Sequence, residues 1–264
     1  MKSLTVAAKG RDSTRDATFA LCNLIFKYCF EIDNLRLCGN MVTVTQQQLT
    51  RIKHFPKADQ VMYYFWVGRL HLSQVKIGSA QENLRVAFDN CTNKNWKTKR
   101  TIFTYLLATS LMLGIFPHPS LVDYFGLTAQ FGPLIRAIKL GHIAGFKSAL
   151  DQQRSWFAKR ALYIHLREKC EVLVWRSLFR RTLFANMRDR PKLDSTKPPV
   201  LTFADLLAAL RFSSQDNTID VNDVECIAVS LLDQNYLRAY ILHSSSLLVL
   251  HKDVKYAFAP PFIT

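Results

Sequence analysis

The spacing of apolar residues constrains the fold of this chain more than any other feature. From Ala17 to about Phe184 they recur at helical intervals, with few stretches that alternate as strands do. This period predicts helices at 16–37, 59–72, 79–91, 99–113, 120–125, 132–140, 143–151 and 155–187. In the first of them we expect one apolar stripe to pack against a neighbouring helix, made of Phe19, Ala20, Leu24, Tyr28 and Ile32. The first two thirds of the chain are therefore predicted to be an all-α array.

Two of these helices have the residue spacing of a tetratricopeptide unit. The large and small positions are Tyr64, Val67, Gly68 and His71 in 59–72, then Ala80, Leu84 and Ala87 in 79–91. Glycine and alanine at such positions let two antiparallel helices approach closely. The following helix pairs keep the alternation but lose the signature, so we expect degenerate repeats that build a core by stacking.

The pattern changes after the polar stretch 192–199, which ends in Pro198 and Pro199. Thr202 is a suitable N-cap for a helix at 203–210, and Asp220 or Asn222 for one at 221–234. Two β-prone runs, 237–243 and 247–251, flank three serines and predict a hairpin. Helices followed by a two-stranded wing are typical of a winged-helix domain.

These C-terminal segments resemble a PCI domain, a module that joins helical repeats to a winged helix. It occurs in the proteasome lid, the signalosome and a translation initiation factor. The resemblance rests on LTFADLLAAL at 201–210, DVECIAVSLL at 223–232 and NYLRAYI at 235–241. It implies a mainly α fold in which degenerate tetratricopeptide-like repeats, 1–164, precede the winged-helix half, 165–264. Family members usually carry a further helical region before the matched part, so we expect this chain to be truncated or to start divergently.

Within that family, the chain is similar to the PCI subunit of the TREX-type mRNA export complex and to the related signalosome-associated fungal PCI subunit. The motifs, with x for any residue, are YYxxVGR at 63–69, KRxIxxYLL at 99–107, MLG at 112–114, LxxAI at 134–138 and WRSLFR at 175–180. The resemblance implies a nuclear protein, also at the nuclear pore and in the cytoplasm. It implies two partners: a large helical scaffold subunit, and a small acidic disordered subunit shared with the proteasome lid.

The charge of the chain favours a polyanionic partner. Thirty-five Lys and Arg against 20 Asp and Glu leave a net charge of +15. The segment 151–192 contains eleven basic residues and only four acidic ones. We expect RNA or DNA to be bound without strong sequence preference by Arg176, Arg180, Arg181, Arg188, Arg190, Lys192, Lys252 and Lys255. Alternatively, these side chains form the solvated face of a long amphipathic helix.

Three further groups of residues have a possible binding role. Lys159 and Arg160 are candidates for binding an acidic partner, and Tyr236 and Tyr240 for packing against another subunit. Lys94, Lys97, Lys99 and Arg100 surround Trp96, which could stack a base but more simply anchors the start of a helix. The helix at 221–234 carries acidic residues and no Lys or Arg, so base-specific readout through it is not expected.

Other classes of function are disfavoured. The phosphate-loop, dinucleotide and zinc-hydrolase motifs are absent, so we predict no enzymatic activity, cofactor or metal. The six cysteines have no metal-ligand spacing and are expected to be reduced core thiols of an intracellular protein. The start lacks a signal-peptide pattern, and the longest apolar run, 102–116, is too short to cross a bilayer.

The leading hypothesis is therefore a non-enzymatic scaffold subunit with a basic nucleic-acid-binding surface, acting in transcription-coupled mRNA export. The first alternative is a signalosome-associated subunit that acts only through protein contacts. A membrane-surface adaptor is a further alternative, supported only by the diffuse positive charge.

Overall fold

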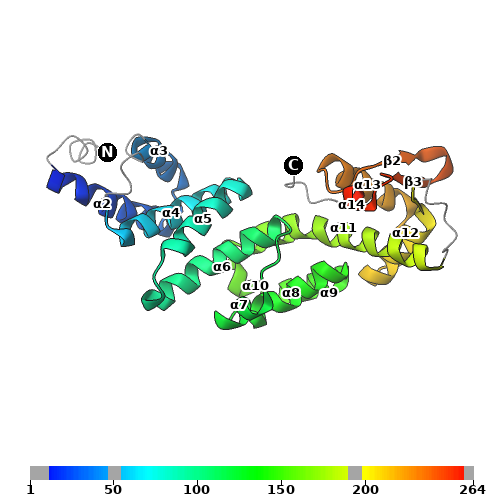
Figure 1. The fold of residues 1–264 in the computed structure, drawn as a ribbon, viewed down its shortest axis with the longest axis horizontal. Helices are drawn as coiled ribbons and strands as arrows, with labels where there is room; N and C mark the ends of the chain where they lie inside the picture. Colours follow the sequence, from blue (N-terminus) through cyan, green and yellow to red (C-terminus); the bar gives the residue numbers. More distant parts are fainter. Residues whose placement is uncertain (1–11, 47–54, 190–197, 259–264) are drawn as a thin grey trace. The chain divides into compact units, whose positions relative to one another are not determined.

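The computed structural model describes residues 12–46, 55–189 and 198–258. Its elements are mainly α-helices with one three-stranded sheet near the C-terminus, which confirms the predicted fold class (Figure 1). The chain divides into two compact units, Met1–Ser110 and Leu111–Thr264. The predicted boundary between residues 164 and 165 falls inside the second unit and stays a prediction.

The first unit contains the predicted helical hairpin. Its elements are α2 (Asp12–Glu31), α3 (Leu35–Gln46), α4 (Lys57–Ser73), α5 (Ile77–Asn90), the 3-10 turn η2 (Asn93–Asn95) and most of α6 (Trp96–Met112). At the crossing of α4 and α5, a Cβ atom on Gly68 would lie 2.7 Å from Cγ of Leu84. A larger residue would force the Leu84 side chain to move, so glycine suits this close approach, which is the role that the repeat spacing predicts.

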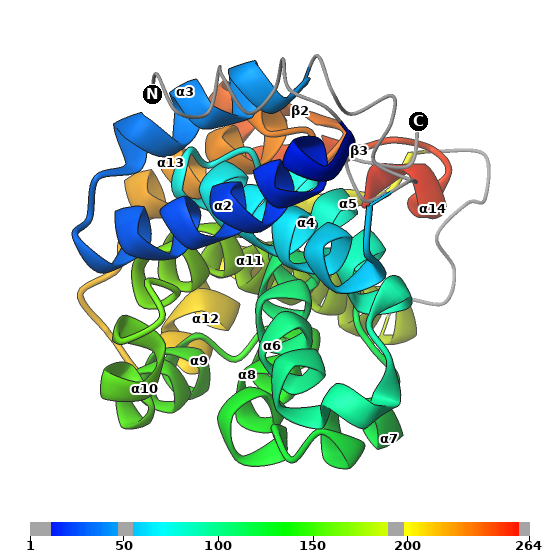
Figure 2. The ribbon, with the colours of Figure 1, turned by 90° about the vertical axis from the view of Figure 1, so that its left-hand side faces the viewer.

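The predicted helix at 16–37 is interrupted, and its predicted buried face is wrong. α2 ends at Glu31, and α3 begins only after Asp33, whose φ is 55°. The buried side chains of α2 include Cys22, Phe26 and Cys29, and α2 lies along α4 (Figure 2). Phe26 meets Tyr63 edge to face at 6.1 Å between ring centroids. Residues of the predicted stripe, Ala20, Leu24, Tyr28 and Ile32, are exposed, because α2 carries a second apolar stripe that packs instead.

Helix α11 (Tyr163–Asp189) is the longest described helix of the second unit (Figure 1). Both α8 (Thr128–Leu140) and α9 (Ile143–Gln152) pack against it. Shorter helices, α7 (Pro119–Tyr124) and α10 (Arg154–Ala158), flank this pair. The turn between α8 and α9 contains Gly141, with φ of 68°, where a Cβ atom would lie 2.5 Å from the backbone nitrogen of Leu178.

The single helix predicted at 155–187 is broken into α10 and α11. Ala161, with φ of 55°, ends the first helix in a left-handed turn. The amide of Leu162 donates to the carbonyl of Phe157 at 3.0 Å, and that of Ala161 to Ala158 at 2.9 Å, which is a Schellman arrangement. The turn buries Leu162 completely. Because alanine is a strong helix former, the sequence does not predict a helix break at Ala161.

The C-terminal part is a winged helix. It contains β1 (Val200–Thr202), α12 (Phe203–Ser214), α13 (Val221–Asp233), β2 (Ala239–Leu242), the 3-10 turn η3 (His243–Ser245), β3 (Leu247–Leu250) and α14 (Val254–Ala257). The sheet order is β1-β3-β2 and both pairings are antiparallel. The hairpin of β2 and β3 confirms the predicted wing, whereas three-residue β1 is too short to show a period and was not predicted.

The structure confirms the predicted cap Thr202, and of the two candidates Asp220 and Asn222 it selects Asp220. The Thr202 hydroxyl accepts from the Asp205 amide at 3.1 Å and begins α12. The Asp220 carboxylate accepts from the Asp223 amide at 2.9 Å, and the Asp223 carboxylate accepts from the Asp220 amide at 2.9 Å. Helix α13 therefore begins with a capping box.

Candidate nucleic-acid interface

The predicted basic cluster lies in the C-terminal half of α11. Between Trp175 and Arg188 this helix has four arginines and no acidic residue. Arg180, Arg181 and Arg188 are exposed, and we call these three the arginine surface. Among the described residues, no carboxylate forms an ion pair with any of the three. Unpaired like charges on one helix repel one another, and a bound polyanion would relieve that repulsion.

Arg176 differs from the arginine surface because it points into the fold. Its Nη2 donates to the carbonyl of Phe258, and its Nε is buried without a partner in the part of the chain that the structure describes. Burial, and then the charge of Arg180, lower the pKa of the Arg176 guanidinium. Arg176 therefore ties Phe258, the residue directly after α14, to α11, and it is not exposed as the phosphate contact expected from the sequence would require.

The remaining predicted basic residues are only partly described. Lys252 is exposed in the bend between β3 and α14. Lys255 belongs to α14, but its side chain is outside the described part of the chain. Arg190 and Lys192 also lie outside the described residues. The arginine surface and Lys252 are thus the predicted nucleic-acid contacts that the structure places at the surface.

Lys159 and Arg160 occupy the turn that separates α10 from α11. Lys159 is exposed. Arg160 donates from Nη1 to the carbonyl of Trp156 at 2.9 Å, and its Cζ lies 3.9 Å from the centroid of the Trp156 ring. Arg160 is therefore held against the protein, which leaves Lys159 as the more accessible cation of the pair.

The two tyrosines proposed as partner contacts have different surroundings. Tyr236 is only 7% exposed, and burial raises the pKa of its hydroxyl. Tyr240 is 57% exposed on β2. Opposite residues of paired strands share a face of the sheet. The register therefore places five apolar residues on one side, of which the central Val249 is buried: Val200, Tyr240, Leu242, Leu247 and Val249. We call this the outer sheet face. Tyr240 belongs to it, whereas Tyr236 supports the core.

Sequence reasoning missed two features of this region. One is Phe184, which is 42% exposed within the arginine surface, with the Cζ of Arg180 5.2 Å from its ring centroid. The spacing of one helical turn between these two residues was a usable signal. The other is the extent of the outer sheet face, which depends on the unpredicted strand β1.

The second basic cluster fits its simpler interpretation. Trp96 is the first residue of α6. Lys99 donates to the carbonyl of Cys91 at 2.7 Å and to the side chain of Asn93 at 2.9 Å, so it ties the preceding loop to α6. This cluster therefore organises the start of a helix.

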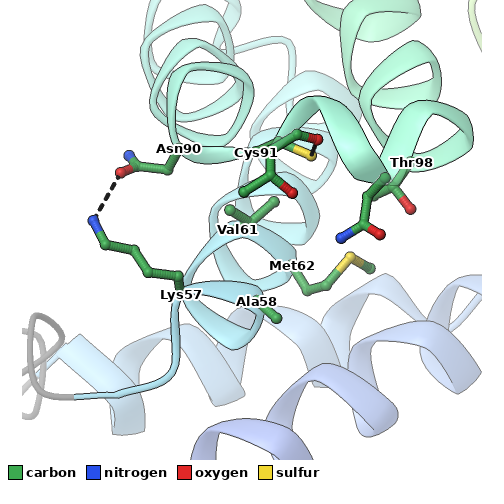
Figure 3. Close-up of a pocket in the computed structure, with 9 residues that line it drawn as sticks. Lys57, Ala58, Val61, Met62, Asn90, Cys91 and Thr98 are labelled. Atoms are coloured by element: carbon green, nitrogen blue, oxygen red, sulfur yellow. Dashed lines mark hydrogen bonds between the residues drawn. The ribbon is translucent and has the colours of Figure 1, made fainter.

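A pocket beside that loop has no features of an active site. It has a volume of about 200 Å³, and its lining includes apolar Val61 and Met62 (Figure 3). Lys57 donates to the Asn90 side chain at 3.3 Å across its edge. Small-molecule sites usually measure about 300 Å³ or more. The residues that line this pocket include no pair of side chains suited to act as general acid and general base. Within 12–46, 55–189 and 198–258, no three potential metal ligands gather, and no helix has the length and apolarity to cross a membrane.

Comparisons with known proteins agree with this architecture. A PCI domain-containing protein of Schizosaccharomyces pombe is 37% identical over 249 residues, which are 94% of this chain and 55% of the relative. A PCI domain-containing protein 2 homolog of Dictyostelium discoideum is 30% identical over 239 residues, 90% and 53% of the two chains. Protein CSN12 homolog of Neurospora crassa is 27% identical over 252 residues, which are 91% of this chain and 55% of the relative. No family model matches the chain. The chain thus spans about half the length of the curated relatives it matches.

Proposed function

The chain belongs to the PCI-domain proteins, and from this premise we propose that it is a non-enzymatic scaffold subunit of a multi-protein complex that holds RNA or DNA on its arginine surface. The observation that carries the nucleic-acid part is the row of exposed guanidinium groups on α11, none of which has a carboxylate partner among the residues that the structure describes. Arginine is suited to phosphate because its planar group donates several hydrogen bonds and always carries charge. Contacts of this kind are independent of base sequence and sensitive to salt.

The scaffold part of the proposal rests on the outer sheet face. Tyr240 and Leu242 expose apolar surface on β2, an edge strand whose second edge has no neighbouring strand in the described sheet. Such a face fits another helical or winged-helix subunit. We assign it to a large helical scaffold subunit, and we assign Lys159 and Arg160 to a small acidic disordered subunit.

The cellular role that we propose is transcription-coupled mRNA export in the nucleus, including the nuclear pore. It is supported by the sequence resemblance to the export-complex PCI subunit together with the basic surface.

A second candidate is a signalosome-associated subunit that acts only through protein contacts. The similarity to Protein CSN12 homolog of Neurospora crassa favours it, as does the apolar outer sheet face, which needs a protein partner and no nucleic acid.

Salt-dependent binding separates the two candidates. The purified chain is titrated with labelled RNA and DNA oligonucleotides of unrelated sequence between 50 and about 200 mM salt, the range over which phosphate contacts weaken strongly. In the double variant Arg180→Glu, Arg181→Glu, we expect weaker binding to every sequence. The slope of log affinity against log salt should become shallower by about 1.4 to 1.8, because each of the two lost phosphate contacts contributes about 0.7 to 0.9.

The matched control is Arg36→Glu, Arg85→Glu, which changes the net charge equally at two exposed positions of α3 and α5. We expect it to keep the wild-type slope. If the wild-type chain binds no oligonucleotide at the lowest salt, or if both double variants lose the same amount, the arginine surface is not a nucleic-acid site and the protein-only candidate stands.

A further inference from the structure

The arginine surface includes an aromatic side chain that phosphate binding does not need. Phe184 is 42% exposed in the middle of the row. It follows Arg180 by one helical turn and precedes Arg188 by one turn, so each lies about 6 Å from it along the axis at 1.5 Å per residue. Arg180 already stacks its guanidinium near the Phe184 ring, with 5.2 Å between Cζ and the centroid. Cations and an exposed ring therefore share one stripe of the helix.

A stripe in which arginines alternate with an exposed aromatic ring should bind single-stranded and double-stranded nucleic acid differently. In a duplex the faces of the bases are covered by their neighbours, so a ring on a rigid helix meets only backbone and groove. In a single strand a base can turn outward and stack on an aromatic side chain while phosphates contact nearby cations. The arginines at 180 and 188 are about 12 Å apart along the helix, with the ring midway. A strand lying along α11 could contact both arginines while one base stacks between them.

The surroundings of Phe184 favour this occupant over an apolar protein segment. No acidic residue occurs between Trp175 and Arg188, and three exposed arginines lie within four positions of Phe184 on the helix. The Asp205 carboxylate is near this half of α11, but it is held by the Asn186 side chain at 2.9 Å. An apolar partner would have to bury unpaired guanidinium groups, which is unfavourable.

We propose that Phe184, together with Arg180 and Arg188, makes the arginine surface selective for single-stranded nucleic acid by stacking one unpaired base. This inference deepens the proposed function and rests on it. RNA and single-stranded DNA provide the same stacking chemistry, so both are used as probes.

The test compares Phe184→Ala with wild type in the full chain, by fluorescence anisotropy at one fixed salt concentration. The probes are an unstructured RNA, a single-stranded DNA of the same sequence, and a blunt duplex of equal length. We expect Phe184→Ala to weaken single-strand binding by about 5- to 140-fold, the range for loss of one stacked base. Duplex binding should change less than about twofold. Phe184→Trp should keep the preference for single strands, and its added indole fluorescence should be quenched by them.

The matched control is Phe212→Ala, because Phe212 on α12 is 87% exposed and far along the sequence from the arginine surface. It should leave both single-strand and duplex binding unchanged. Equal losses for single strands and duplex in Phe184→Ala, or the same effect in Phe212→Ala, would overturn the stacking inference while the proposed function stands. Absence of binding to every probe by the wild type would instead remove the proposed function itself.

Discussion

Replacing Gly141 with alanine should destabilise the second unit strongly, for two separable reasons. Its φ of 68° lies in the left-handed region, which costs about 1–2 kcal/mol once a Cβ atom is present. That Cβ atom would also lie 2.5 Å from the nitrogen and 2.6 Å from the Cα of Leu178. Those are backbone atoms of α11 and cannot move aside as a flexible side chain could. Forcing an extra carbon into a packed contact costs about 1–3 kcal/mol, so the sum is about 2–5 kcal/mol.

The structure provides a control with the same backbone conformation and no crowding. Gly126 has φ of 60°, and a Cβ atom added there would meet nothing within 4 Å beyond its chain neighbours. Gly126→Ala should therefore lose only the conformational part, about 1–2 kcal/mol. Both variants are followed by circular dichroism during thermal and urea unfolding. With about 2–4 °C per kcal/mol for a domain of this size, Gly141→Ala should lower the midpoint by about 4–20 °C. Equal destabilisation by the two variants would refute the packing of the α8–α9 turn on α11.

Two other predictions concern a buried thiol and a helix cap. Burial raises the pKa of Cys170 from 9.0 to about 12, so the unfolded chain releases this proton at lower pH than the folded one. The stability that comes from this difference is present below pH 9 and is lost as the pH rises from 9 toward 12. Urea unfolding at several pH values measures it. Over this range the free energy of unfolding of Cys170→Ala should decline less than that of wild type or of the exposed-site control Cys226→Ala. Asp220→Ala removes the capping box of α13 and should lower the free energy of unfolding by about 0.5–2 kcal/mol, whereas Asp233→Ala, at the last residue of the same helix, should be neutral or slightly stabilising. Similar losses in these two variants would contradict the assigned cap.

The sequence predicts best those elements whose signals are local. The α4–α5 hairpin follows from the spacing of small residues around Gly68, and the starts of α12 and α13 follow from Thr202 and Asp220. In each case one side chain is enough to define the feature. The hairpin of β2 and β3 is predicted equally well, because two β-prone runs lie on either side of a short polar turn.

Features that depend on distant parts of the chain are not predicted. Both apolar stripes of α2 have helical spacing, and only the arrival of α4 selects the one with Phe26. The left-handed turn at Ala161 has no glycine and is stabilised by burying Leu162. The inward direction of Arg176 depends on the carbonyl of Phe258, 82 positions later.

The candidate site shows the same division. The excess of arginines in α11 can be counted in the sequence, and three of them lie at the surface. Which of the four is buried, and whether the phenylalanine among them is exposed, depends on the tertiary packing of α11.

The position of β3 has a consequence for how this chain is made. It is the middle strand of the described sheet and follows both of its neighbours in the sequence, so within this sheet β1 and β2 cannot pair until Leu247–Leu250 has been synthesised. On the ribosome, the segment from α12 onward must therefore wait for almost the whole of the described chain to emerge before its sheet can close. During that interval the strand residues that later form the wing are open to chaperones and to mispairing with other nascent chains.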